Sequence, residues 1–431
     1  MESFNTQPPV IPFDIIALII DTVGENEDID LLKELALVSH SFLQICNKHL
    51  FATIDLHDAA PRRQRASSKK GFVKLLRSRP DVVKYIRKLT YTMSGIARLR
   101  SVKEDRLLSS ILPNFLKTIP QLDCLVINAL GSDWNTREPS LISALLHLMH
   151  LPTMNHIYLA FIKNFPLSSL APCVNLHELD LLYMETKNGF PEIIQSEMPR
   201  IRRLSTSQSS RLTRNFLHAK RRDGQPALDL TDLKQLQMSF GHPEDGHNIQ
   251  YLLQNAKLLD KLNLSCERDG LTLEGLHDIL SPVSRTLKTL ELSMTLYHDD
   301  DPPLGGLCDE LEAMAGHNVL EVLAFQLNIV NHETADFIGS RIEMVDKVLV
   351  KPGWSALKQV SVDISIAYCP PSREFSAVVL MEALQPLKEF GEVKLMEAVQ
   401  PLPDKYLSHL SKLESVTLNF STWVVDLSRV L

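Results

Sequence analysis

"LDKLNL" (residues 259–264) and "LKTLEL" (287–292) carry the pattern that decides the fold of this 431-residue chain. Apolar residues, mostly Leu, Ile, Val or Met, occupy the first, fourth and sixth positions, and this alternation predicts a short strand with one buried face. The pattern recurs with first residues 22 to 37 positions apart, and only in "IRRLST" does the last position fail. The twelve matches are "IRKLTY" (86), "LDCLVI" (122), "MNHIYL" (154), "LHELDL" (176), "IRRLST" (201), "LKQLQM" (233), "LDKLNL" (259), "LKTLEL" (287), "LEVLAF" (320), "LKQVSV" (357), "FGEVKL" (390) and "LESVTL" (413).

Many segments between these matches have helical spacing of apolar residues, as in Leu273, Leu276 and Leu280. A unit of one strand and one helix cannot bury its apolar face alone, so neighbouring units have to stack. The predicted fold class is therefore α/β, a curved leucine-rich-repeat solenoid of about twelve repeats with its strands on the concave side. The Asn common in such repeats, eight residues after the first apolar position, occurs only as Asn328, so we expect irregular repeats.

A different pattern occupies the N-terminal region, "IPFDIIALIIDTV" (residues 11–23). Pro12 suits the first turn of a helix and Asp14 its positive end, so a helix is predicted from about residue 12 to 23. Two short helices, "LLKELALVSHSF" and "SFLQICNKHLF", should follow. The first helix carries two adjoining apolar rows, wider than one buried face requires: Ile15, Ile19 and Thr22, and Ile16, Ile20 and Val23.

Three blocks of this region, "IPFDIIALII", "LALVSHSF" and "HLFATIDL", resemble the successive blocks of an F-box over residues 10–56. Together with a degenerate leucine-rich array, they make the chain similar to the F-box proteins, particularly those of mushroom-forming fungi. The departures are Ile11 and Asp14, where Leu and Glu are commoner, and a third helix without the usual Trp. The resemblance implies the substrate-recognition subunit of a Skp/cullin/F-box ubiquitin ligase. Its F-box would bind a Skp-type adaptor, and through it a cullin, while the repeats hold an unknown protein substrate.

The resemblance also assigns an adaptor-binding set, and the sequence leaves open which members face the adaptor and which the core of the module. The set is Pro12, Ile15, Ile16, Ile19, Leu35, Val38, Ser39, Phe42, Leu50 and Phe51. The rival interpretation is a non-catalytic leucine-rich-repeat scaffold, whose helical module only caps the apolar end of the solenoid. In both, the predicted domains are an F-box module (10–56), a basic linker (57–80) and the solenoid (81–431).

Two segments are strongly basic. Residues 61–79 hold eight Lys or Arg and no acid, which fits a solvated linker, a nuclear address or a region phosphorylated at Ser67 or Ser68. Residues 198–222 also hold eight bases after Glu197. If Leu204 points inward, Arg203 and Ser205 point to the concave face, where with Arg211 they could bind an acidic or phosphorylated substrate segment. The alternative for this segment is a solvated basic loop.

Composition and motifs exclude several classes of function. With 52 acidic against 45 basic residues and a pI near 6.1, the chain lacks the charge of a nucleic-acid-binding protein. Phosphate-loop, nucleophile-elbow, HExxH and CxxC motifs are absent, so no enzymatic activity and no cofactor are expected. "GHPEDGH" (241–247) has metal-binding side chains, but its place after a predicted strand favours a turn, and no metal site is predicted.

The expected location follows from the N-terminal region and the cysteines. Asp14 and Asp21 interrupt the apolar run, which is too short to cross a membrane, and Glu2 is the only charged side chain before it, so neither a membrane segment nor a signal peptide is expected. Six scattered cysteines without CxxC spacing fit a reducing compartment. A cytoplasmic or nuclear protein, or one found in both, is therefore predicted.

Overall fold

A computed structural model of the chain divides into two compact units, Met1–Pro199 and Arg200–Leu431, and each is described by itself. The residues that the structure describes are 12–26, 28–56, 69–93, 111–185, 199–207, 219–220, 224, 226, 228–240, 243–266, 273–296, 306–329, 343–368 and 416–426.

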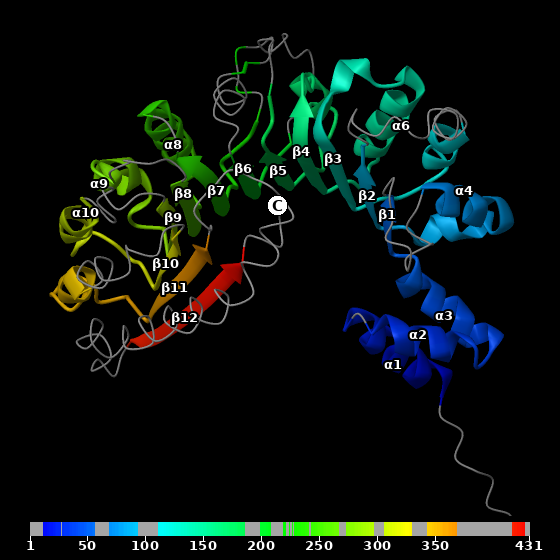
Figure 1. The fold of residues 1–431 in the computed structure, drawn as a ribbon, viewed down its shortest axis with the longest axis horizontal. Helices are drawn as coiled ribbons and strands as arrows, with labels where there is room; N and C mark the ends of the chain where they lie inside the picture. The colour runs from blue at the N-terminus through cyan, green and yellow to red at the C-terminus, as the bar shows by residue number, and fades with distance from the viewer. Residues whose placement is uncertain are drawn as a thin grey trace, which may run out of the picture. The chain divides into compact units, whose positions relative to one another are not determined.

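The first unit contains three N-terminal helices and five parallel strands, which lie side by side in the order of the sequence (Figure 1). Each strand pairs with the next in the chain, so that Lys88 pairs with both Thr53 and Cys124. The elements are α1 (Phe13–Glu25), α2 (Ile29–Ala36), α3 (His40–Leu50), β1 (Thr53–Leu56), α4 (Lys69–Ser78), η2 (Pro80–Tyr85), β2 (Lys88–Thr92), β3 (Cys124–Asp133), η3 (Trp134–Thr136), α6 (Pro139–Met149), β4 (His156–Lys163), η4 (Leu167–Leu170) and β5 (Glu178–Leu182), with a further helical segment at 111–116.

The second unit repeats the same arrangement with seven parallel strands, again in sequence order. Its elements are β6 (Arg203–Ser207), β7 (Gln235–Phe240), α8 (Pro243–Asn255), β8 (Lys261–Cys266), α9 (Leu276–Leu280), η5 (Ser281–Val283), β9 (Thr289–Leu296), α10 (Leu307–Met314), β10 (Val322–Ile329), β11 (Gln359–Tyr368) and β12 (Thr417–Asp426), with a further helical segment at 343–349.

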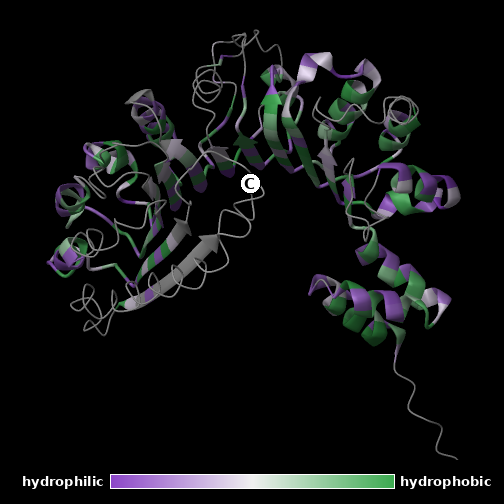
Figure 2. Ribbon diagram, viewed as in Figure 1, coloured by the Kyte–Doolittle hydropathy of each residue, from purple (hydrophilic) through white to green (hydrophobic). Residues whose placement is uncertain are grey.

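One face of each sheet is buried under its helices. In the second unit Leu262, Leu290 and Leu323 occupy one level of the sheet and are fully buried. Helices α8, α9 and α10 lie along that face, and their residues alternate between apolar and polar, as expected for helices with one buried side (Figures 1 and 2). None of the described helices covers the other face of this sheet, on which Gln237, Gln326 and Asp363 are exposed.

Neighbouring helices of the second unit are joined by a carboxylate. Glu310 of α10 accepts hydrogen bonds from the backbone N–H groups of Gly275 (2.7 Å) and His277 (2.6 Å) at the start of α9. Gly275 has φ +81°, a left-handed conformation that glycine adopts without strain. The two bonds satisfy backbone donors that the first turn of a helix leaves without partners.

Replacing Glu310 by Gln should therefore lower the free energy of unfolding of the second unit by about 1–2 kcal/mol, because the amide keeps only one acceptor and no charge. Asp309→Asn is the matched control, since Asp309 is an exposed acid on the same turn of α10. Chemical denaturation measures both variants, and equal effects would contradict a specific role for Glu310.

The α/β class is correct, but the predicted curved leucine-rich-repeat solenoid of about twelve irregular repeats is wrong. The structure shows all-parallel sheets with helices in two compact units, and one strand plus one helix is not the constant unit. The connection between β4 and β5 contains the short 3-10 turn η4, and the described residues between β6 and β7 contain no helix. The six-residue pattern specifies a strand buried on one face, and any parallel sheet covered on that face satisfies it, whatever lies between the strands.

The predicted domain boundaries differ from the observed units. Strand β1 lies within the predicted F-box module and pairs with β2. In the predicted basic linker, residues 69–78 form α4, which buries Phe72 and Leu76, while 57–68 lie outside the described residues. Lys69 donates a hydrogen bond to the carbonyl of Thr92 (2.8 Å). This basic side chain thus joins α4 to the sheet.

Candidate functional site

Helices α1, α2 and α3 enclose a small hydrophobic core of their own. Ile20, Leu32 and Cys46, one from each helix, are its fully buried members. Seven partly buried side chains pack around them: Ile16, Val23, Leu35, Ala36, Phe42, Ile45 and Leu50. We call α1–α3 the helical module. Of the two apolar rows of α1, the one that contains Ile16, Ile20 and Val23 faces this core.

Short polar side chains fix the starts of α2 and α3. Asp28 accepts a hydrogen bond from the backbone N–H of Leu31 (3.1 Å), and Ser39 accepts one from that of Phe42 (3.2 Å). Such N-caps satisfy backbone donors at a helix start and are worth about 1 kcal/mol each. Ser39, a predicted adaptor-binding residue, therefore has a structural role at the start of α3.

A contact between α1 and α3 holds the module together at its other end. The Nε2 atom of His49 lies 2.6 Å from Asp21 Oδ1, and Lys48 Nζ lies 3.2 Å from the same oxygen. The hydrogen bond from His49 lowers the pKa of Asp21, burial opposes this effect, and Lys48 adds to it. Gly24 faces the imidazole so closely that a Cβ atom there would lie 2.2 Å from the ring. The two helices thus meet where only glycine fits.

The helical module also exposes large apolar side chains. Eight of the fourteen large hydrophobic residues found exposed in the described part of the chain lie between residues 13 and 38. Leu37 is 88% and Leu18 63% exposed, so these side chains contribute little to the core of the module. We call the set the apolar module surface: Phe13, Ile15, Leu18, Ile19, Ile29, Leu31, Leu37 and Val38. A monomer rarely leaves so many apolar side chains together without a partner.

The structure divides the predicted adaptor-binding set into three groups. Ile15, Ile19 and Val38 belong to the apolar module surface. Four others pack in the core: Ile16, Leu35, Phe42 and Leu50. The remaining three lie at helix ends: Pro12 at the start of α1, Ser39 at the start of α3 and Phe51 at the end of α3.

Sequence reasoning missed five members of the apolar module surface, namely Phe13, Leu18, Ile29, Leu31 and Leu37. Leu18 could have been found, because it lies three residues after Ile15 and therefore on the same side of the helix. Leu37 lies in the turn between α2 and α3, where helical periodicity gives no information about exposure.

The second unit offers a surface of different character, the open face of its sheet. Here the strand register aligns mostly polar side chains across neighbouring strands. Each is next in sequence to a buried apolar residue and therefore points to the opposite face of the sheet. One level of the ladder runs Ser205, Gln237, Asn263, Glu291, Ala324, Ser361 and Asn419. Another runs Ser239, which is buried, Ser265, Ser293, Gln326 and Asp363. We call these two levels the polar sheet face.

Hydrogen bonds between neighbouring strands order part of this face. Glu291 accepts a hydrogen bond from Asn263 Nδ2 (2.9 Å) and forms an ion pair with Lys261 Nζ (2.7 Å). Asn419 Nδ2 lies 3.5 Å from Ser361 Oγ. Rows of hydroxyl and amide groups can donate and accept hydrogen bonds to a peptide, so the face is suited to a polar protein segment.

The predicted substrate-binding residues lie on β6 or outside the described residues. Arg203 and Ser205 are both partly exposed, while Leu204 between them is buried. Arg203 pairs in register with Gln235, and Ser205 with Gln237, so both lie at one end of the polar sheet face. Arg211 lies outside the described residues.

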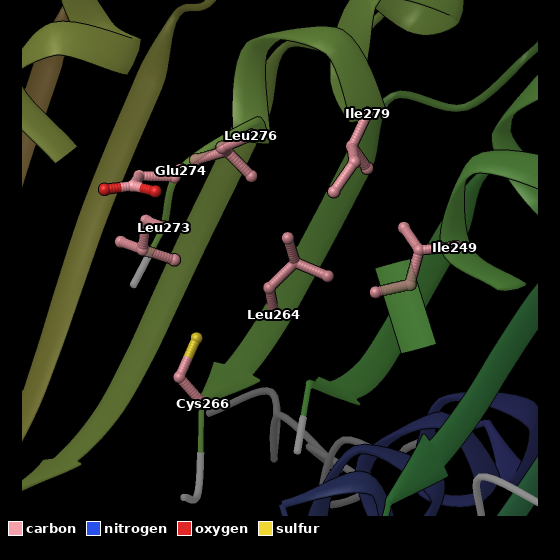
Figure 3. A pocket seen from close by; sticks show the side chains of 7 residues that line it. All are labelled: Ile249, Leu264, Cys266, Leu273, Glu274, Leu276 and Ile279. Carbon is pink, nitrogen blue, oxygen red and sulfur yellow. The ribbon is translucent and has the colours of Figure 1, made fainter. Parts of the chain in front are cut away.

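The two cavities described in the second unit are poor ligand sites. The first is lined by Glu274 and by apolar side chains of α8, β8, α9 and the residues just before α9 (Figure 3). It has a volume of about 10 Å³, scarcely enough for one water molecule. The second, about 320 Å³, lies beside η5 and the end of α10. Its polar groups are bonded locally, since Ser284 donates to the carbonyl of Ser281 and Asn318 to that of Met314.

Comparison of the chain with models of known protein families found no match, and comparison with the curated proteins found none either. The described residues contain no cluster of three or more His, Cys, Asp or Glu side chains that could hold a metal ion. Among the helices in the described ranges, none is both long and apolar enough to cross a membrane.

Proposed function

We propose that this protein is the substrate-recognition subunit of a Skp/cullin/F-box ubiquitin ligase. The helical module binds a Skp-type adaptor, and through it a cullin, and the sheet holds a protein substrate. The observation that carries the proposal is the apolar module surface, which lies on the region that resembles an F-box. The protein itself catalyses nothing, needs no cofactor, and acts in the cytoplasm, the nucleus or both.

The division of the module into a core and an apolar surface supports this role. Ile20, Leu32 and Cys46 stabilise the module, so Ile15, Ile19 and Val38 are available to a second protein. Burying one such side chain contributes about 1.5–3 kcal/mol. Four or five of them outweigh the cost of ordering and leave a contact of roughly micromolar strength.

The polar sheet face is the part of the molecule best suited to bind the substrate. Its hydroxyl and amide side chains can bond to an extended or irregular protein segment, and Arg203 adds a cation that favours an acidic or phosphorylated one. Tethering a substrate raises its effective concentration beside the ligase to the millimolar range for a short flexible connection. Positioning, without chemistry in this chain, is sufficient for the proposed role.

A second candidate function is a scaffold whose helical module only caps the end of the sheet. This is favoured by the link from α3 to β1, where the carbonyl of Ala52 accepts bonds from the N–H groups of Arg87 (2.8 Å) and Lys88 (2.9 Å). A module that served only as a cap would bury its apolar residues against the sheet. Ile15, Ile19 and Val38 remain exposed within the whole chain, which favours the adaptor-binding role.

The double variant Ile19→Asp with Val38→Asp should lower the affinity for a recombinant Skp adaptor more than about a hundredfold. It removes two apolar contacts worth roughly 1.5–3 kcal/mol each and forces two new charges to lose water at the interface. Isothermal titration calorimetry of the full chain measures this. Ile16 is unsuitable for the test, because it packs against the core of the module.

The matched control is Ser41→Asp with Gln44→Asp, which adds the same charge at exposed positions of α3 outside the apolar module surface. It should keep the affinity of the wild type. If the variant at Ile19 and Val38 bound the adaptor as tightly as the wild type, adaptor binding through this surface would be rejected. The scaffold would then be the remaining candidate function.

A further inference from the structure

A thiol, an imidazole and a carboxylate meet across three neighbouring strands of the first unit. His156 on β4 lies between Cys124 on β3 and Glu178 on β5 in the strand register. Its Nδ1 atom is 3.4 Å from Cys124 Sγ, and its Nε2 atom is 2.8 Å from Asp180 Oδ2. We call Cys124, His156 and Asp180 the thiol–imidazole cluster.

The cluster belongs to the face of the sheet opposite the buried leucines. Ile157 and Leu179, the residues next to His156 and Glu178, are fully buried, so alternation directs His156 and Glu178 away from that core. The side chain of Asp180 is only 9% exposed and that of His156 is 23% exposed, which lets the carboxylate hold the ring in place. Cys124 is only half-buried, unlike the fully buried residues of the core.

The charges around His156 favour its protonated form. Burial lowers the pKa of His156, but the hydrogen bonds with Asp180 and Cys124 outweigh burial and raise that pKa to about 9. Glu178, whose Oε2 lies 3.8 Å from Nδ1, adds a further negative charge from β5. On β4 itself Tyr158 has a raised pKa, through burial and the charge of Asp180. At neutral pH an imidazolium therefore lies beside the sulfur.

A second cysteine of the same unit provides the contrast. Cys173 is buried and donates a hydrogen bond to the carbonyl of Met149 (3.3 Å). Burial raises the pKa of the Cys173 thiol to about 12, so this thiol is inert at neutral pH. Cys124 and Cys173 thus allow one experiment to compare two environments in one molecule.

We propose that Cys124 is a modification site, a thiol oxidised by hydrogen peroxide with assistance from His156 and Asp180. The nucleophile is the thiolate form of Cys124, the reactive form of any thiol, and its sulfur attacks one oxygen of the peroxide. The new S–O bond forms as the O–O bond breaks, so sulfur loses two electrons and the peroxide gains them. The hydroxide that leaves takes the Nδ1 proton of His156 and becomes water. Asp180 is a positioning residue that orients the ring.

The size and position of the cluster favour a small reactant. Neither of the two cavities described above includes any of its residues. A peroxide molecule needs only the sulfur and a proton donor on the leaving oxygen, and both are present. The proposal concerns the first unit alone and is independent of the binding of an adaptor to the helical module.

The test uses the full chain treated with hydrogen peroxide at pH 6.5 in the presence of dimedone, which traps sulfenic acid, followed by site-resolved mass spectrometry. Cys124 should be labelled at least tenfold faster than Cys173. His156→Gln should slow labelling of Cys124 at least tenfold, because glutamine carries no proton for the leaving oxygen. His177→Gln is the matched control, an imidazole of the same unit that bonds only the Asn175 carbonyl in the described contacts.

The pH dependence in the wild type gives an independent readout. The labelling rate of Cys124 should fall as the pH rises from 8.5 to 10.5, because His156, whose pKa is about 9, loses the proton that it gives to the leaving oxygen. The rate of an ordinary thiol with a pKa of about 8.5 instead rises and then levels off over that range. Such a rise, or an unchanged rate in His156→Gln, overturns the proposal. If His156→Gln does not fold, the buried Cys173 becomes exposed and is labelled as well. The pH profile of the wild type then decides whether the proposal stands.

Discussion

Gly24→Ala is expected to destabilise the helical module by about 2–4 kcal/mol, although alanine is the better helix former by about 1 kcal/mol. The added Cβ would lie 2.2 Å from the Cγ and Nδ1 atoms of His49, closer than real side chains approach. The ring cannot move aside freely, because its Nε2 is held 2.6 Å from Asp21 Oδ1. Either α1 and α3 separate, or the bond between His49 and Asp21 breaks.

The double-mutant cycle with His49→Ala tests this explanation. His49→Ala removes the ring and should cost about 1.5–3 kcal/mol through the lost bond to a charged group. In that background Gly24→Ala should be neutral or slightly stabilising, since the space is then free. Hydrogen exchange of peptides from α1–α3 measures the stability of the module. An equal cost of Gly24→Ala in both backgrounds would mean that the ring is not the obstacle.

Leu290→Ala is expected to destabilise the second unit by about 2–5 kcal/mol, the largest effect of a single truncation that we predict. Leu290 is fully buried on β9 and pairs in register with Leu262 on β8 and Leu323 on β10. Removing its side chain leaves a cavity between strands and helices that the parallel ladder prevents from closing.

Ser293→Ala is the matched control for Leu290→Ala, because Ser293 lies on the same strand and on the polar sheet face. It should change the free energy of unfolding by no more than about 0.5 kcal/mol. Chemical denaturation combined with hydrogen exchange of β8, β9 and β10 measures both variants. Comparable losses at the two positions would show that both faces are packed, and the polar sheet face would then not be available to a substrate.

Local patterns predicted the strands well and the connections poorly. "LDKLNL" covers the first four residues of β8 and "LKTLEL" the first four of β9, because alternation over six residues is enough to define a strand with one buried face. Strand β1, "TIDL", was missed, since its four residues were included in a helical block. "FGEVKL" (390–395) lies outside the described residues. The solenoid prediction failed because the spacing of strands does not determine what lies between them.

The candidate surfaces, too, could be predicted only in part from the sequence. The sequence showed two apolar rows on α1 but could not choose between them, because both are rich in isoleucine and only packing against Leu32 and Cys46 distinguishes them. The thiol–imidazole cluster was missed because its members are 24 and 32 residues apart. A signal was present, since Cys124, His156 and Glu178 each occupy the third position of their six-residue pattern and therefore align in a parallel sheet.

The sequence order of the strands has a consequence for how such a chain can fold and change. Each strand in a unit pairs with the next strand along the chain, so no pairing has to bridge an intervening strand and pairing can spread from any neighbouring pair. Duplicating or deleting one strand with its connection would leave the remaining registers intact. The length of the polar sheet face can therefore vary in evolution without altering the module that precedes it.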